Sequence, residues 1–299
     1  MPGAAVASAR GLRLCTRVQG VPVLDVILIY LATGALAGFV SGLFGVGGAY
    51  TMAPALIVAL PLHGAPDDHV MHLTVGTSLA VMAVTSTWVA LLRWRVGDLQ
   101  LRMTARFVPF IAAGALFGVA VGDALPNLAL KVLFIGFIGL TVVRGIFYRG
   151  HAAIPGGGDA GAVRGLPLWG YGALTGFTGS LLGPGPAIII APWLRRLRYP
   201  MPMVSATASA LAALVGLASA AGYIWTGADE AGLPEWSLGY LFLPAFIGLA
   251  VGAFIGSPFG IRVSHKAPDM LLHRVFISYL ALLMVVMIVQ TVMKQMASG

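Results

Sequence analysis

The chain is dominated by long runs of apolar residues that carry almost no charge. A helix that crosses a membrane needs about 20 such residues to span a hydrocarbon core of about 30 Å. Inside a bilayer the backbone polar groups must bond to one another, so runs of this length are expected to be α-helices. The eight predicted spanning segments are Val23–Leu43, Thr74–Leu92, Phe107–Val121, Leu128–Val143, Leu166–Leu182, Met203–Trp225, Leu238–Ile255 and Leu271–Met293.

The charged residues are too few to cover the surface of a soluble protein. Hydrophobic types form 59% and charged types 9% of the 299 residues, where about 25% charged residues is usual for soluble domains. This composition excludes a soluble enzyme, a disordered chain and a nucleic-acid-binding domain, despite a net charge of +8. The single cysteine, Cys15, excludes a disulfide framework. The sequence therefore predicts an all-α polytopic membrane protein surrounded by the lipid bilayer, with no cofactor.

Two further apolar runs are too short to cross a membrane. Ala49–Leu60 and Ala187–Leu194 would reach only about 18 and 12 Å as helices, at 1.5 Å per residue. Each follows a long segment after a glycine-rich break. We expect both to be re-entrant half-helices that do not complete a crossing.

The same motif occurs twice in the chain. Residues 34–54 and 172–192 are identical at eleven of 21 positions without a gap, which indicates a tandem duplication. Glycines spaced by four in each copy, at 34, 38 and 42 and at 172 and 176, are expected to allow close helix packing. The predicted organisation is a polar N-terminal tail at 1–22, with a signal peptide as the alternative, a membrane repeat at 23–148, a Gly/Pro linker at 149–165, a second repeat at 166–293 and a C-terminal tail at 294–299.

The basic residues predict how the repeats are oriented. If the two short runs do not cross, the basic residues of 93–106, 144–164, 195–198 and 262–274 fall on one side and the acidic loops 61–73 and 227–237 on the other. The positive-inside rule then places the basic side in the cytoplasm. The two repeats are inverted in this arrangement, and both chain ends are outside. If the short runs instead completed a crossing, the repeats would be parallel.

The duplicated motif resembles that of the TauE/SafE sulfite exporter family. The resemblance rests on residues 38–48 with Pro54 and Gly76-Thr77-Ser78, and on residues 176–186 with Pro192 and Thr207-Ala208-Ser209. It implies an anion permease for sulfite, sulfonates or related sulfur oxyanions. The sequence departs from the family pattern at Ala49, Pro184 and Pro186, and these departures change the backbone donors at the breaks.

The two glycine-rich breaks form the predicted substrate site. A helix N-terminus carries unpaired N–H groups and a partial positive charge, so it binds anions readily. Two such termini facing each other would bind an oxyanion without a buried Lys or Arg, and hydroxyl groups of the following helices could add donors or could bond to their own backbone instead. The candidate substrate-binding residues are Gly45, Gly47, Gly48, Ala49, Tyr50, Thr77, Ser78, Gly183, Gly185, Pro186, Ala187, Thr207 and Ser209.

Inverted repeats with interrupted helices at matching positions predict a secondary transporter that works by alternating access. An anion channel and a membrane-embedded subunit of a larger complex are the alternatives, and the oligomeric state stays open. An enzyme is not expected, because the central segments lack acids, bases and metal ligands. His63, His69 and His72 are read as part of a solvated external loop rather than a metal site. The expected location is the bacterial inner membrane.

Overall fold

The computed structural model is almost entirely helical, and it describes residues 17–18, 21–45, 47–66, 68–147, 166–183, 186–197, 199–230, 232–266 and 268–298. The helices are α2 (Val23–Phe44), α3 (Ala49–Leu62), α4 (Val70–Arg95), α5 (Leu101–Ala124), α6 (Asn127–Ile146), α7 (Leu166–Leu182), α8 (Ile190–Arg196), α9 (Met201–Thr226), α10 (Leu243–Lys266) and α11 (Asp269–Ser298), with a 3₁₀ turn η1 (Pro186–Ile188) ahead of α8. The strands are short: β1 (Arg17–Val18) pairs with β2 (Val21–Pro22), and β3 (Ser237–Leu238) pairs with β4 (Leu241–Phe242).

The helices confirm an all-α polytopic membrane protein. Seven of the described helices, α2, α4, α5, α6, α9, α10 and α11, are long and apolar enough to cross a membrane. The eighth predicted segment is present as α7, but its 17 residues reach only about 25 Å before the glycine break. At the C-terminus, α11 continues through the residues assigned to a tail, as far as Ser298. The predicted linker lies outside the described residues.

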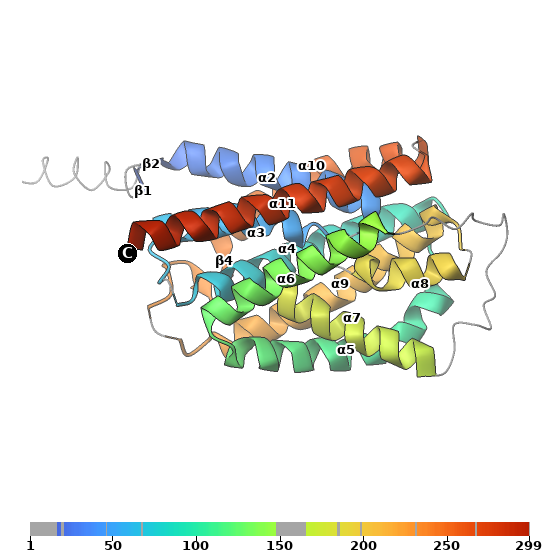
Figure 1. Ribbon diagram of the computed structural model, residues 1–299, viewed down its shortest axis with the longest axis horizontal. Coiled ribbons are helices and arrows are strands. Elements are labelled where there is room, and N and C mark those ends of the chain that lie inside the picture. Colours follow the sequence, from blue (N-terminus) through green and yellow to red (C-terminus); the bar gives the residue numbers. More distant parts are fainter. Residues whose placement is uncertain are drawn as a thin grey trace, which may run out of the picture.

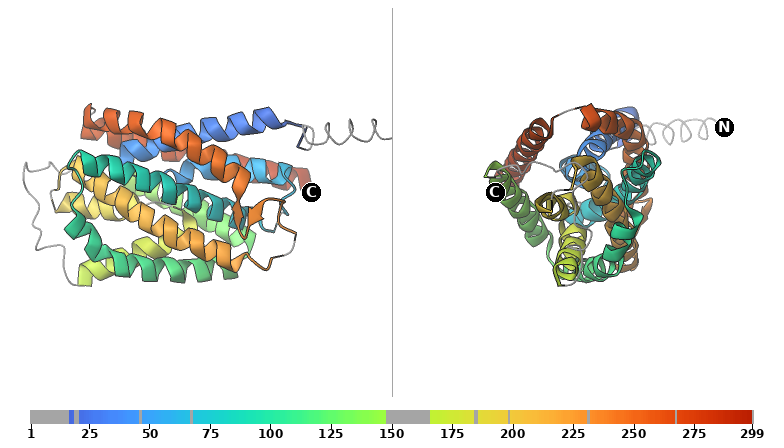
Figure 2. Two further views of the ribbon diagram at one scale, coloured as in Figure 1. Left: turned by 180° about the vertical axis from the view of Figure 1, so that it is seen from behind. Right: turned by 90° about the vertical axis from the view of Figure 1, so that its right-hand side faces the viewer.

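Two helices form the centre of the bundle. In the apolar windows of α4 and α9, 72% and 67% of the residues are buried, against 22% for α6 and 17% for α11. The helices α4 and α9 pack against each other, with α3 on α4 and α8 on α9. The outer helices follow the long axis of the bundle (Figure 1), and the view along that axis shows them around the inner ones (Figure 2).

The outer helices pack in pairs through glycine. A Cβ atom placed on Gly38 of α2 would lie 2.2 Å from the carbonyl oxygen of Ala253 in α10, and Gly34 and Gly42 are equally tight. On α7, a Cβ at Gly176 would lie 2.3 Å from the carbonyl oxygen of Ile111 in α5. Only glycine fits at such distances, so the predicted role of these glycines in close packing is confirmed.

The helix directions follow from the two breaks. The helix α2 starts at one end of the bundle, and α3 runs back toward that same end (Figure 1). The helix α7 starts at the opposite end, and α8 runs back toward the end where α7 started. The two halves therefore run in opposed directions around the breaks, as inverted repeats require. The inverted relation itself stays a prediction, and it can be tested at the loops.

The charges separate between the two ends of the bundle. We call the end at which α4, α6, α8 and α10 finish the basic end, since it carries Arg95, Arg144, Arg196 and Lys266. We call the opposite end the acidic end; its described residues include Asp68, Asp123, Asp229, Glu230 and Glu235.

The histidine loop at the acidic end is packed rather than solvated, which corrects our expectation. His63 lies between the rings of Tyr30 and Phe242, with centroids 6.1 and 4.9 Å away, and burial lowers the pKa of His63. His72 belongs to α4, is 5% exposed and lies 3.2 Å from the carbonyl oxygen of Gly122 through its Nε2 atom. The apolar rings exclude water here, although the sequence reads as a polar loop.

The glycine packing predicts that Gly38→Val prevents folding. Its Cβ would lie 2.2 Å from a backbone oxygen, which can move only if α2 and α10 separate. We expect no monodisperse protein in detergent. The matched control is Gly136→Val in α6, where no atom lies within 4 Å of the added Cβ; it should elute and melt like the wild type. A Gly38→Val protein with wild-type elution and melting would contradict this packing.

The inverted arrangement predicts which loops face the cytoplasm. In a Cys15→Ser background, Arg196→Cys should react with an impermeant thiol reagent only from the cytoplasmic side, and Glu230→Cys only from outside. Both side chains are exposed and lie at opposite ends of the bundle (Figure 1). Labelling of both variants from the same side would exclude this topology.

Candidate substrate site at the helix breaks

The first break joins α2 to α3 through glycines in the left-handed backbone region. Gly45, Gly47 and Gly48 have φ angles of +73°, +85° and +76°, a conformation that is costly for residues with a Cβ atom. Gly48 caps α3 without a side-chain hydrogen bond. The N-terminus of α3 therefore lies in the bundle interior with backbone groups, rather than a side chain, at its end.

The first break is packed against both central helices. A Cβ atom at Gly45 would lie 2.5 Å from the carbonyl oxygen of Ser205 and 3.1 Å from the Ser209 Oγ in α9. One at Gly47 would lie 2.5 Å from Met82 Cγ and 3.2 Å from Ser86 Oγ in α4. The sequence thus places glycine where two helices leave no room for a side chain.

The second break differs in form from the expected one. Gly183 follows α7 with a φ angle of +75°, and Gly185 lies outside the described residues. We expected an α-helix from Ala187 with Pro186 as its first residue, but Pro186–Ile188 form a 3₁₀ turn and the seven-residue α8 begins at Ile190. The α-helix therefore starts three residues later than expected, with Ile190 as its first residue.

The two breaks meet in the interior. A Cβ atom at Gly183 would lie 3.4 Å from the Cβ of Ala49, the first residue of α3, and 4.0 Å from Ser78 Oγ in α4. The pairing is reciprocal, since Gly45 faces Ser209 of α9 as Gly183 faces Ser78 of α4. Ala49, Ser78 and Ser209 are at most 2% exposed. The structure therefore brings together glycines and serines from both halves in a place closed to solvent.

The four predicted hydroxyl donors have different partners. Ser78 Oγ donates to the carbonyl oxygen of Val75 at 3.0 Å, and Ser209 Oγ donates to that of Ser205 at 2.8 Å. Thr77 Oγ1 accepts a hydrogen bond of 3.0 Å from the backbone N–H of Phe242 in β4. Thr207 Oγ1 is buried and has no hydrogen-bond partner among the described residues. Thr77 therefore holds the β3–β4 hairpin, whereas Thr207 lies on the opposite side of α9 from Ser205 and Ser209, which face the first break.

Tyr50 and Tyr279 add aromatic residues beside the breaks. The ring of Tyr50 is 3% exposed and packs edge-on to Phe134 at 5.5 Å, while its hydroxyl has no partner among the described residues. Tyr279 of α11 donates its hydroxyl hydrogen to Thr51 Oγ1 at the start of α3. Phe134, Tyr279 and Ser205 were not among the predicted site residues. Ser205 could have been found, since it precedes Ser209 by one helical turn.

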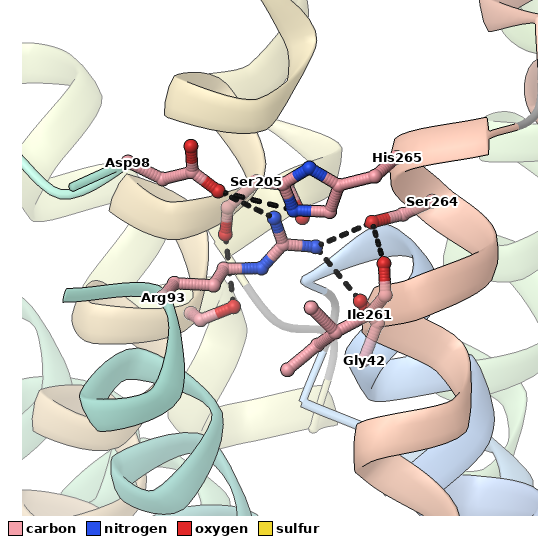
Figure 3. Close-up of polar contacts among 8 residues, drawn as sticks. Gly42, Arg93, Asp98, Ser205, Ile261, Ser264 and His265 are labelled. Carbon is pink, nitrogen blue, oxygen red and sulfur yellow. Dashed lines mark hydrogen bonds and ion pairs between the residues drawn. The ribbon is translucent and has the colours of Figure 1, made fainter. Parts of the chain in front are cut away.

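A fully buried arginine lies next to the first break. Arg93, in the last turn of α4, is 0% exposed, although the sequence predicts that it belongs to the basic loop 93–106. Its Nη2 atom donates to the carbonyl oxygen of Gly42 in α2 at 2.8 Å and to Ser264 Oγ in α10 at 3.1 Å. Asp98 Oδ2 lies 3.5 Å from its Nη1 and 3.3 Å from His265 Nε2 (Figure 3). The Arg93 side chain thus links three segments at the basic end.

Metal binding has no candidate among the residues that the structure describes. Nowhere in them do three or more His, Cys, Asp or Glu side chains come together in a group that could hold a metal ion. The groups described at the breaks and at Arg93 are hydrogen-bond donors: backbone amides, hydroxyls and one guanidinium. Such donors suit an anion.

The hydrogen bond of Thr77 predicts a structural role for this residue. Thr77→Val leaves the N–H of Phe242 buried without an acceptor, which costs about 1–3 kcal/mol. The melting temperature should fall by several degrees, while the KM for a transported anion stays unchanged. Thr77→Ser, which keeps the acceptor, is the control. A raised KM at an unchanged melting temperature would return Thr77 to the substrate site.

Comparison with known proteins agrees with this architecture. The family model "Sulfite exporter TauE/SafE" matches residues 30–287. A probable membrane transporter protein of Haemophilus influenzae is 26% identical over 257 residues, which cover 85% of this chain and 95% of the relative. A probable membrane transporter protein of Methanocaldococcus jannaschii is 23% identical over 239 residues, covering 80% and 86%. No solved structure matches significantly. The chain is therefore a member of the TauE/SafE sulfite exporter family of membrane transporters.

Proposed function

We propose that this protein is a secondary transporter that carries small sulfur-containing anions, such as sulfite or a sulfonate, across the plasma membrane by alternating access. Family membership makes it a membrane transporter. The observation that carries the finer proposal is the meeting of the two breaks, where the N-terminus of α3 lies beside Gly183 and Ser78. For a bacterial source, the membrane would be the inner membrane.

The donors at the breaks suit an anion of modest size. The α3 N-terminus presents the positive end of a helix dipole, which stabilises negative charge. Tyr50, the second residue of α3, supplies a buried hydroxyl without a partner among the described residues, and Ser86 and Ser205 supply two more beside Gly47 and Gly45. Acidic side chains at this depth would repel an anion, and the described parts of α4 and α9 contain none. A site built from dipoles and hydroxyls binds moderately, which allows release on the other side.

The burial of the site favours a carrier over a channel. Ala49, Tyr50 and Ser209 are at most 3% exposed, so an anion reaches them only after the helices rearrange. The opposed directions of the halves provide the means, because two inverted halves can exchange their conformations and so open the site to each side in turn.

The proposal is tested by a pair of substitutions at Gly183 that differ only in charge. Both Asn and Asp tolerate the left-handed backbone region better than other residues with a Cβ, and the added Cβ is 3.4 Å from its nearest neighbour. Gly183→Asp places a carboxylate beside the bound anion, where the repulsion is about 3 kcal/mol at partly buried spacing. Sulfite uptake into proteoliposomes should fall more than about hundredfold.

Gly183→Asn carries the same bulk and backbone strain without the charge, so it should keep a measurable fraction of uptake. Equal uptake by the two variants would remove the region of Gly183 from the path of an anion. A wild-type protein that moves an organic cation but no sulfur oxyanion would overturn the proposed substrate class.

A further inference from the structure

The donors of Arg93 are incompletely used within the fold. A guanidinium has five N–H donors, and the two N–H groups of Nη2 donate to the carbonyl oxygen of Gly42 and to Ser264 Oγ. Nε and Nη1 have no hydrogen-bond partner among the described residues, although Arg93 is 0% exposed. Burying a charge with unsatisfied donors is costly. A purely structural arginine would be expected to fill these positions with acceptors.

Asp98 is a poorly matched partner for this guanidinium. Its Oδ2 lies 3.5 Å from Nη1, and the geometry does not make a hydrogen bond. Asp98 belongs to the loop between α4 and α5, its side chain is 16% exposed, and it is shared with the half-buried His265. The carboxylate therefore occupies a position close to solvent beside Nη1. An incoming oxyanion could take this position and accept a hydrogen bond that Asp98 does not make.

Buried polar side chains lie at the first break as well as at Arg93. Ser86 precedes Arg93 by two helical turns on the same face of α4, about 10 Å along the axis, and its Oγ lies beside Gly47. Ser205 Oγ of α9 lies beside Gly45. Neither serine hydroxyl has a partner among the described residues. The hydroxyls of Ser86 and Ser205 therefore lie at the first break, and Ser86 shares its face of α4 with Arg93.

We propose that Arg93 is an anion-binding residue at the basic end of the transport path, and that Asp98 is a competing carboxylate that occupies its guanidinium when no anion is present. An oxyanion passing between the breaks and the basic end would displace Asp98 and bind Nη1 before or after the central site. The inference rests on the proposed function, since it needs an anion on this path. It adds a second binding position and a residue that selects for negative charge.

The proposal is tested by sulfite uptake into proteoliposomes, with the KM measured separately for sulfite presented at each end of the protein. Asp98→Asn removes the competitor and should lower the KM at the basic end about threefold or more, leaving the other end unchanged. Arg93→Gln should raise the basic-end KM about tenfold or more, as expected for the loss of a charged hydrogen bond. Arg93→Lys keeps the charge but has fewer donors and should fall between wild type and Arg93→Gln.

The matched control is Arg95→Gln. Arg95 is exposed and lies two residues after Arg93, so this variant removes the same charge from the surface. Its KM should stay within about twofold of the wild-type value. The comparison separates binding of an anion at Arg93 from general attraction of anions to a basic surface. Protein amount and melting temperature are measured for every variant. If Arg93→Gln fails to fold, Asp98→Asn decides the question alone, because its side chain is near the surface.

An unchanged basic-end KM in folded Asp98→Asn would overturn the inference, and so would equal changes at both ends. Arg93 would then only bind the end of α2. A wild-type protein that moves no sulfur oxyanion would overturn the proposed function itself, whereas normal wild-type uptake with an unaltered Asp98→Asn overturns the Arg93 inference alone.

Discussion

A helix that stops inside a bilayer leaves backbone N–H and C=O groups that water cannot reach, and this constraint governs the centre of the structure. At the first break the N–H of Gly45 bonds to the carbonyl of Ser41 at 2.8 Å, and the carbonyl of Gly42 accepts from Arg93. At the second, the N–H of Gly183 bonds to the carbonyl of Gly179 at 2.9 Å. The central helices α4 and α9 are polar enough along one face to surround these ends. The same groups that make the breaks tolerable are the ones that the proposed function assigns to anion binding.

Close packing around the breaks depends on glycine for a second reason. Lipid is as apolar as a leucine side chain, so helices gain little from the hydrophobic effect when they associate in a membrane and rely on close contact instead. The facing glycine rows of α2 and α10 bring backbone against backbone, and α5 and α7 pack in the matching way. Each broken helix is therefore supported along its length by a helix of the other half, while its end stays free of bulky side chains.

Periodicity, length and self-similarity were sufficient to predict the helices, the two breaks and the glycine packing, because each depends on local sequence or on a repeated motif. The boundaries that failed depend on other forces. The second short helix starts at Ile190, after a 3₁₀ turn that the first short helix does not have, and the histidine loop is buried by Tyr30 and Phe242, which are distant in sequence. At the candidate site, the repeated motif was sufficient to predict the glycines of the breaks, but it did not predict the roles of Thr77 and Arg93. Thr77 bonds to Phe242 and Arg93 to Gly42 and Ser264, and no sequence pattern joins these positions.

The two halves share a sequence motif, but the polar side chains near it differ. Arg93 at the end of α4 reaches Gly42 in α2 and Ser264 in α10. The last turn of α9 carries Tyr223 instead, which is buried. Its hydroxyl lies beside Gly122 of α5, which also faces Leu181 of α7. On the transport path proposed above, a guanidinium at one end and a phenol at the other would give an anion unequal affinity on the two sides. Inverted halves would make the two conformations of such a carrier similar in energy, so side chains such as this pair would set the remaining asymmetry between loading and release.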